Sequence, residues 1–258
     1  MRLAIRLRLE REARIPISHQ AELAGVVYRL LRESDEEYAE FLHERGYALD
    51  EDPVRRMKLF VFSGLRAPAS RRRAEGASLR LAPGPVDWYL SSPREEFLAH
   101  SATGLLCAGS EIRVGAVPFL IEEVRVLAEP VFAERMQFTC LTPVVASVRR
   151  EDGTTHYLRP WQAEAFSEAV RRNALRKHAL VHGGAPEDDR LELRWKESYL
   201  ARAPHQGTKC VTIKGIRVVG VQAPLTLSGS PALLRIAYHC GLGEKNAAGF
   251  GMVEELHR

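Results

Sequence analysis

The order of the hydrophobic patterns along this chain constrains its fold more than any other feature. Over residues 1–11, apolar side chains alternate with charged or small ones, which is the period of a strand with one buried face. A helical pattern follows, with apolar residues three or four positions apart at Leu23, Val26, Val27, Leu30 and Leu31. The first half continues with a short helix over 35–45 and with strand-like runs over 58–63, 77–81 and 86–90. A helix over 93–106 and a strand-like run over 112–127 complete it.

The second half repeats this order without repeating the sequence. Strand-like runs cover 135–150, 191–195, 209–221, 225–227 and 250–256. Helical runs cover 161–181 and 231–240. Each half therefore has the order βαββαβ, which is that of a ferredoxin-like (RRM-like) domain. We predict an α+β fold of two tandem ferredoxin-like domains, over 1–128 and 129–258.

Length, net charge and cysteine spacing limit the classes of protein to which this chain can belong. A chain of 258 residues buries enough surface to fold without disulfides or structural metals. The net charge of +4 is only weak evidence for a polyanionic partner. No apolar run is long enough to span a membrane, and the N-terminus lacks the pattern of a signal peptide. We expect a cytoplasmic protein with reduced thiols and neither metal nor cofactor, because no CxxC spacing occurs among Cys107, Cys140, Cys210 and Cys240.

The most specific motif lies near the C-terminus, between the last predicted helix and strand. Residues 241–251 have the sequence GLGEKNAAGFG, with four glycines and a lysine at position 245. Glycine permits positive φ and lets backbone N–H groups approach a phosphate, and Lys245 adds a cation. These residues, Gly241, Gly243, Lys245, Gly249 and Gly251, can therefore form a loop that binds a phosphate group, with a simple turn as the alternative.

This glycine-rich loop resembles the signature of the RAMP proteins of CRISPR systems. Its extended form, GLGEKNAAGFGMVE, is similar to the C-terminal motif of the Cas-six endoribonucleases, which cut precursor CRISPR RNA. The N-terminal third agrees with the first two helices and the following strand of that family through the segments IPISHQAELAGVVYRLL, YAEFLHERGY and KLFVFSGL. Residues 66–235 add little specific similarity. The resemblance implies tandem ferredoxin-like domains with an inter-domain cleft for repeat RNA.

The resemblance also implies a reaction. Metal-free RNA cleavage uses the 2′-OH beside the scissile phosphate as the nucleophile and leaves a 2′,3′-cyclic phosphate and a 5′-OH. It needs a base, an acid and cations at the phosphorane. The expected partner is CRISPR repeat RNA, as precursor and as mature guide. A homodimer and a CRISPR effector complex are further assemblies that the sequence leaves open.

His43 is the first candidate for the catalytic base, because FLHERGY lies where the resembling family has its catalytic histidine. The alternative is a histidine at a helix C-terminus that only complements the helix dipole. Tyr28 precedes it by fifteen residues, which matches the family's tyrosine-to-histidine spacing, although it could equally be a core tyrosine. Some relatives have a lysine six residues after the histidine, where this chain has Leu49. The third role therefore stays open among Arg45, Lys58 and Lys245.

Other basic residues are weaker candidates. His19 lies at the start of the first helix, where the helix dipole favours a neutral imidazole that can act as a base. An exposed residue near the helix cap is the alternative for His19. The helix over 161–181 presents a basic face that can follow an RNA backbone or simply be solvated, formed by Arg171, Arg172, Arg176 and Lys177.

Two other functions compete with the endoribonuclease. RAMP folds also serve as non-catalytic RNA-binding subunits of CRISPR effector complexes, and the Tyr28–His43 spacing argues against that role. The other alternative is a ferredoxin-like enzyme whose glycine loop binds a nucleotide. It lacks support, because no GxxxxGK[ST] and no strand–GxGxxG–helix segment occurs.

Overall fold

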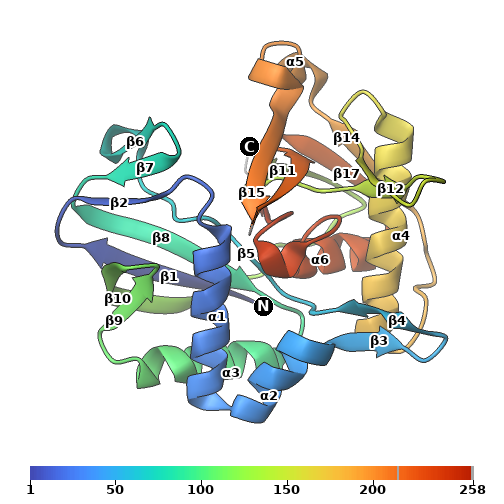
Figure 1. Cartoon of the computed structure of the whole chain (residues 1–258). Coiled ribbons are helices and arrows are strands. Elements are labelled where there is room, and N and C mark those ends of the chain that lie inside the picture. Colours follow the sequence, from blue (N-terminus) through green and yellow to red (C-terminus); the bar gives the residue numbers. More distant parts are fainter. Residues whose placement is uncertain (214, 257–258) are drawn as a thin grey trace.

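The alternating N-terminal segment forms the central strand of an antiparallel sheet (Figure 1). The computed structural model describes residues 1–213 and 215–256. In the N-terminal half the strands are β1 (Arg2–Leu9), β2 (Ala13–Pro16), β3 (Tyr47–Leu49), β4 (Asp52–Met57), β5 (Val61–Phe62), β6 (Arg72–Glu75), β7 (Ser78–Leu81), β8 (Gly84–Ser91), β9 (Glu111–Val114) and β10 (Val117–Leu127). Its helices are α1 (Gln20–Ser34), α2 (Glu36–Glu40), the π-helical turn η1 (Phe41–Arg45), the 3₁₀ turn η2 (Ala69–Arg71) and α3 (Glu95–Cys107).

The C-terminal half begins with β11 (Arg135–Cys140) and ends with a short strand beside it. The other strands are β12 (Ser147–Arg149), β13 (Thr155–Tyr157), β14 (Leu191–Trp195), β15 (Thr208–Ile213), β16 (Ile216–Val221), β17 (Leu225–Gly229) and β18 (Val253–Glu255). The helices are α4 (Ala163–His182), α5 (Glu197–Leu200), the 3₁₀ turns η3 (Pro204–Gly207) and η4 (Asn246–Ala248), and α6 (Pro231–Cys240).

The two main sheets share one topology. The N-terminal sheet has the order β5-β8-β1-β10-β9, and the C-terminal sheet has the order β14-β17-β11-β18. In both, the first strand lies between the third and fourth strands of a βαββαβ unit, and all pairings are antiparallel. The prediction of tandem ferredoxin-like domains is therefore confirmed.

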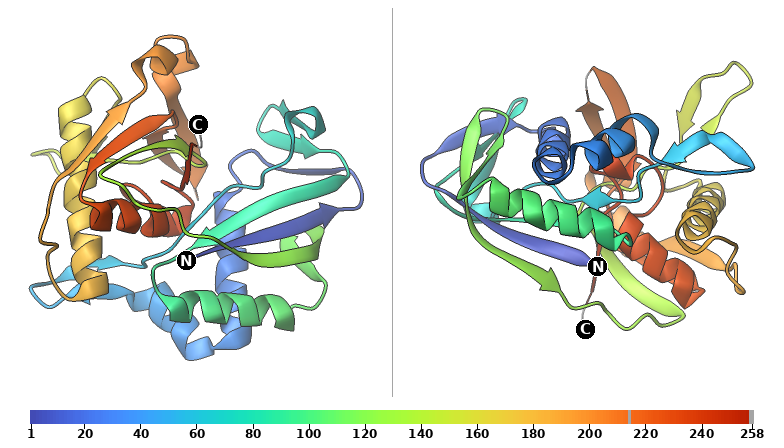
Figure 2. Two further views of the ribbon diagram at one scale, coloured as in Figure 1. Left: turned by 180° about the vertical axis from the view of Figure 1, so that it is seen from behind. Right: turned by 90° about the horizontal axis from the view of Figure 1, so that it is seen from below.

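Each sheet is covered by two helices, and apolar side chains fill the space between them. Leu3, Ile5 and Leu7 of β1 are buried with side chains of α1 and α3 in one cluster. A second cluster joins the C-terminal sheet to α4 and α6. Figure 2 shows these helix pairs on their respective sheets. Among the described residues, no helix is both long and apolar enough to cross a membrane.

Three predicted strands are wrong in extent. The segment 209–221 forms the antiparallel pair β15–β16 rather than one strand. The segment 112–127 is a hairpin rather than one strand, because Gly115 adopts a φ of 61° and turns the chain between β9 and β10. The segment 135–150 leaves the sheet after Cys140, and its last residues pair in the separate β12–β13 hairpin.

The two halves of the chain contact each other through a hairpin that the sequence pattern did not reveal. The β3–β4 hairpin extends from the N-terminal half to α4 of the C-terminal half (Figures 1 and 2). Arg176 of α4 fastens it: its guanidinium donates to Asp52 Oδ2 at 2.8 Å and to the carbonyl oxygen of Arg55 at 2.7 Å. This clamp places the end of β4 at the junction of the domains.

Candidate active site

Three side chains from separate elements meet at the junction of α1, η1 and β4. The rings of Tyr28 and His43 lie edge to face, with centroids 5.0 Å apart and planes 85° apart. Lys58, the residue after β4, donates from Nζ to Tyr28 Oη at 3.0 Å and to the carbonyl oxygen of His43 at 2.7 Å. The structure therefore brings together the two residues predicted from spacing and one of the three candidates for the remaining role.

The π-helical turn η1 explains how His43 reaches solvent. The turn buries Leu42 and leaves the His43 side chain 59% exposed. Gly46 ends it with a φ of 68°, and a Cβ there would lie 2.8 Å from the carbonyl oxygen of Met57. A π-bulge inserted in a helix is a frequent device at functional sites. Here it turns the imidazole outward beside β4.

A carboxylate orients the His43 ring. Nδ1 lies 2.6 Å from Glu44 Oε1, and Nε2 forms no hydrogen bond with any residue that the structure describes. A carboxylate at Nδ1 favours the tautomer that has its proton on that nitrogen. Nε2 is then a free acceptor, as a general base requires.

Burial shifts the pKa values of Tyr28 and Lys58 in opposite directions. It raises the pKa of Tyr28, so the phenol keeps its proton and acts as a hydrogen-bond donor at neutral pH. Burial lowers the pKa of Lys58, an effect that the carboxylate of Glu44 partly offsets. A lysine in this setting gives up its proton more readily than one in water.

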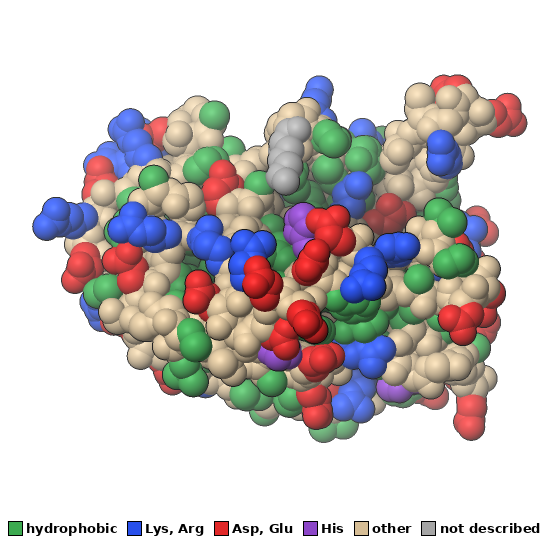
Figure 3. Space-filling model, turned by 60° about the horizontal axis from the view of Figure 1, so that its bottom comes forward, with side chains coloured by type: hydrophobic (Ala, Val, Ile, Leu, Met, Phe, Trp, Pro, Cys, Tyr) green, Lys and Arg blue, Asp and Glu red, His purple; other side chains and the backbone are tan. Residues whose placement is uncertain are grey.

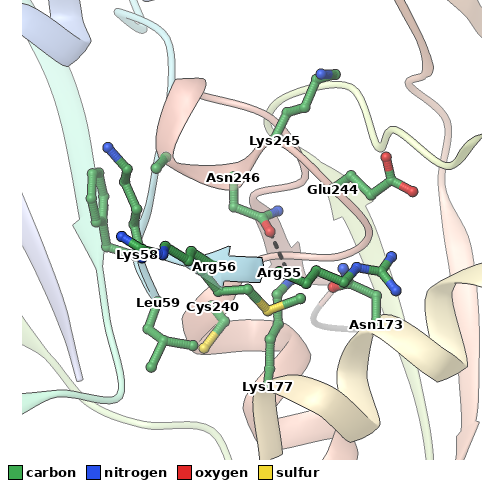
Figure 4. Close-up of a pocket in the computed structure, with 13 residues that line it drawn as sticks. Arg55, Arg56, Lys58, Leu59, Asn173, Lys177, Cys240, Glu244, Lys245 and Asn246 are labelled. Carbon is green, nitrogen blue, oxygen red and sulfur yellow. Dashed lines mark hydrogen bonds between the residues drawn. The ribbon is translucent and has the colours of Figure 1, made fainter. Parts of the chain in front are cut away.

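A cleft of about 280 Å³ opens beside Lys58, between the two halves of the chain. Figure 4 shows its basic side chains, which extend from the end of β4, from α4 and from the glycine-rich loop. Its walls come from the β4–β5 segment, α4, α6 and that loop, and its cations other than the buried Lys177 are Arg55, Arg56, Lys58 and Lys245. In Figure 3, basic and acidic side chains are intermixed across the face that is shown. The excess of positive charge in the cleft suits a phosphate backbone.

The glycines of the loop 241–251 serve its own folding. All four have positive φ and are buried. A Cβ at Gly241 would lie 2.6 Å from Asn246 Nδ2 and one at Gly249 would lie 2.7 Å from Phe62 Cε2, whereas Gly243 and Gly251 face backbone carbonyl oxygens of Val145 and Leu242. The backbone N–H groups of Gly249 and Gly251 donate to the carbonyl oxygens of Asn246 and Pro143, so these two are not available to a phosphate. The role of Gly241 and Gly243 in binding a phosphate stays a prediction. Lys245 alone is exposed at the tip.

The structure gives His19 a structural position instead of a catalytic one. Its ring is buried, with Nδ1 3.1 Å from the carbonyl oxygen of Pro16, while Nε2 accepts from the backbone N–H of Leu65 at 3.2 Å. Burial lowers its pKa, which keeps the ring neutral. Neither nitrogen is free for a substrate, and the exposed alternative is equally wrong.

The basic face of α4 is mostly occupied by protein. Arg171 bonds to Asp189 and lies near Glu168, and Arg176 bonds to Asp52, so the prediction that they bind RNA conflicts with their contacts. Arg172 is exposed and lines a second cavity of about 330 Å³ next to the cleft, together with Arg55 and Arg149.

Sequence reasoning missed the roles of three basic residues. Arg55 and Arg56 lie on β4, whose exposed faces give no alternation to find. Lys177 was assigned to the basic face of its helix, but it is buried. Its spacing from Val170 and Ala174, seven and three residues, is that of the apolar face and was the available signal. In the part of the chain that the structure describes, no three His, Cys, Asp or Glu side chains are grouped to hold a metal ion.

Comparison with known proteins gives a consistent result. The family model "CRISPR-associated protein Cas6, N-terminal" matches residues 14–125, and "CRISPR associated protein Cas6, C-terminal" matches residues 127–255. The chain is 29% identical to the CRISPR-associated endoribonuclease Cas6 of Pyrococcus furiosus, over 98% of this chain and 89% of that protein. It is 27% identical to the CRISPR-associated endoribonuclease Cas6 1 of Methanocaldococcus jannaschii, over 98% of this chain and 92% of that protein.

Solved structures share the fold over the whole chain. A structure described as that of a Cas6-related gene from Pyrococcus furiosus has a TM-score of 0.82 at 21% identity and covers 100% of this chain and 98% of its own. A structure described as CRISPR associated protein Cas6 has a TM-score of 0.77 at 26% identity, over 100% of this chain and 99% of its own.

Proposed function

This chain belongs to the Cas6 family of CRISPR-associated proteins, and from that membership we propose that it cleaves CRISPR repeat RNA through Tyr28, His43 and Lys58, without a metal ion. It is an endoribonuclease, as are its relatives matched over nearly their whole length. The observation that carries the mechanism is the convergence of the three side chains beside a basic cleft.

The first half of the reaction is a proton transfer coupled to attack. Nε2 of His43 takes the proton of the 2′-OH, and the 2′ oxygen forms a bond to the scissile phosphorus. Glu44 on Nδ1 stabilises the imidazolium that results. The Tyr28 phenol, protonated because burial raises its pKa, donates to a non-bridging oxygen of the phosphorane.

The second half is departure of the 5′ oxygen. The bond between phosphorus and the 5′ oxygen breaks, and the ammonium of Lys58 gives that oxygen its proton. Two of its three N–H groups bond to Tyr28 and His43, which leaves one for the substrate. The products are a 2′,3′-cyclic phosphate and a 5′-OH, and solvent restores both protonation states.

The test is cleavage of the repeat RNA of the source genome in EDTA, with protein in excess over 5′-labelled RNA. We expect complete cleavage and a cyclic phosphate end. An otherwise identical RNA with a 2′-deoxy sugar at the cut should bind and stay intact. Loss of cleavage in EDTA, with recovery in Mg²⁺ or Mn²⁺, would overturn the mechanism. Tight binding of the all-ribose RNA without any cleavage would instead make the chain a non-catalytic RNA-binding subunit.

A further inference from the structure

Helix α4 buries a lysine directly beneath the glycine-rich loop. Lys177 is 4% exposed, and its Nζ donates to the carbonyl oxygens of Gly241 at 2.7 Å and Gly243 at 2.9 Å and to Asn246 Oδ1 at 2.7 Å. An ammonium has three N–H donors, and all three are used. Figure 4 shows Lys177 rising from α4 toward Asn246.

Burying the Lys177 ammonium costs free energy, because the group loses its hydration. Among the described residues no carboxylate forms an ion pair with Lys177, so neutral oxygens alone offset the loss of its hydration. A charged group is costly to bury without a counterion. Among its buried neighbours on α4, Val170 and Ala174 are apolar and Asn173 is polar, and an apolar residue at position 177 would satisfy packing alone. Packing alone therefore does not explain a lysine at this position, and its hydrogen-bond partners in the loop do.

Lys177 fixes the backbone of residues 241–246 through its hydrogen bonds. It draws together oxygens from both ends of the segment 241–246, and Asn246 continues the network by donating from Nδ2 to the carbonyl oxygens of Leu242 and Phe250. Between these fixed points lies Lys245, with a φ of 59° that a lysine rarely adopts without outside support. Figure 4 shows Lys245 on the side of Asn246 away from Lys177.

The same segment also contacts the half of the chain that carries the catalytic residues. The turn η4 packs against α1 and β5, and Ala247 contacts the N-terminal core. Lys177 thus anchors the loop from the C-terminal domain, while α1 and β5 limit it from the other side. The exposed lysine at the tip is held at the edge of the cleft.

We propose that Lys177 is a positioning residue for RNA, whose buried ammonium holds the glycine-rich loop in the conformation that presents Lys245 to the phosphate backbone in the cleft. The proposal rests on the proposed function for the identity of the ligand. It does not place Lys177 in contact with RNA, and it assigns the binding contribution to Lys245.

The protonation of Lys177 supports this role. Burial lowers its pKa to about 8, while Cys240 of α6 and Glu244 of the loop act in the opposite sense. The ammonium therefore predominates at neutral pH, and all three bonds to the loop persist. The neutral amine has only two N–H donors, so one loop oxygen loses its partner as the pH rises past 8.

The test uses Lys177→Met, which keeps an unbranched side chain as far as Cε and removes the ammonium group. Its control is Lys196→Met, which removes one exposed charge at the start of α5. In the free protein, we expect amide hydrogen exchange over 241–251 to accelerate at least tenfold in Lys177→Met and to stay unchanged in Lys196→Met. RNA affinity should fall about tenfold in Lys177→Met, while the single-turnover rate at saturating protein stays within about threefold of the wild type.

A double-variant cycle decides whether Lys177 acts through Lys245. The double variant Lys177→Met/Lys245→Met should bind RNA no more weakly than the weaker of the two single variants. Fully additive losses would overturn the proposal, as would unchanged exchange of the loop. If Lys177→Met does not fold, Lys177→Gln, which keeps two donors, should show the same changes in the same direction. The exchange measurement needs no RNA, so a wild-type protein that neither binds nor cuts repeat RNA would refute the proposed function and leave this anchor separately testable.

Discussion

Replacing Lys58 by Met tests the one catalytic group that the sequence left open. Lys58 is half-buried and donates to Tyr28 Oη at 3.0 Å and to the carbonyl oxygen of His43 at 2.7 Å. The substitution removes the charge, the proton donor and the link between the other two residues. Loss of one donor to developing negative charge costs roughly 10²–10³ in rate, or about 3–4 kcal/mol of transition-state stabilisation. We expect a fall of that size in the single-turnover rate.

The assay is single-turnover cleavage at saturating protein, so that the rate reports chemistry rather than binding. Arg56→Met is the matched control, because Arg56 lines the same cleft two residues earlier and contacts neither Tyr28 nor His43 among the described residues. It should weaken affinity but leave the saturated rate within about threefold. A substrate with a sulfur leaving group at the 5′ position needs no acid, and it should recover much of the rate lost in Lys58→Met. A Lys58→Met rate within threefold of wild type would refute the assignment.

Three further predictions address the loop and the domain junction. Lys245→Ala should flatten the dependence of log affinity on log salt by about 0.7, the slope of one phosphate contact to single-stranded RNA; an unchanged slope would contradict that contact. Gly243→Val should lower the free energy of unfolding by about 3 kcal/mol or more, because its Cβ would collide with the carbonyl oxygen of Val145; an unchanged melting temperature would be inconsistent with this packing. His239 is buried between the N-terminal amine and Glu129, and burial lowers its pKa to about 4 from about 6.5 in the unfolded chain. Since the unfolded chain then binds the extra proton, the free energy of unfolding should fall by ~3 kcal/mol from pH 6.5 to 4. Denaturant titrations across that range should show a flatter profile for His239→Gln, and equal profiles would refute the linkage.

The repeated order of hydrophobic patterns was sufficient to predict the architecture. Strands with one buried face, such as β1, show a clear alternation, and long helices such as α4 show a clear periodicity. The β3–β4 hairpin has neither signal, because β4 is exposed on both faces and held by Arg176 from the other domain. Hairpins inside long apolar runs were also missed, since one glycine, Gly115, decides the turn.

The candidate site could be predicted only in part, for physical reasons. A fifteen-residue spacing relates Tyr28 to His43, but their 5.0 Å separation depends on how α1 and η1 pack. Lys58 reaches them only because β4 returns beside η1. The glycine motif marked the correct loop, yet the demand for glycine comes from the loop's contacts with protein. Because Lys177 is charged and lies on a helix with other basic residues, the sequence predicts an exposed side chain. In the structure it is buried and donates to carbonyl oxygens of the loop.

The most direct test of the catalytic assignment is the single-turnover rate of His43→Ala at saturating protein, measured together with RNA affinity. His43 is exposed and its Nε2 has no partner among the described residues, so the change removes a base with little effect on folding. We expect the rate to fall by roughly 10²–10⁴, the usual contribution of one general acid or base, with affinity within about threefold of wild type. Normal cleavage by His43→Ala, together with loss of cleavage in His19→Ala, would contradict the assignment and return the catalytic role to the buried imidazole.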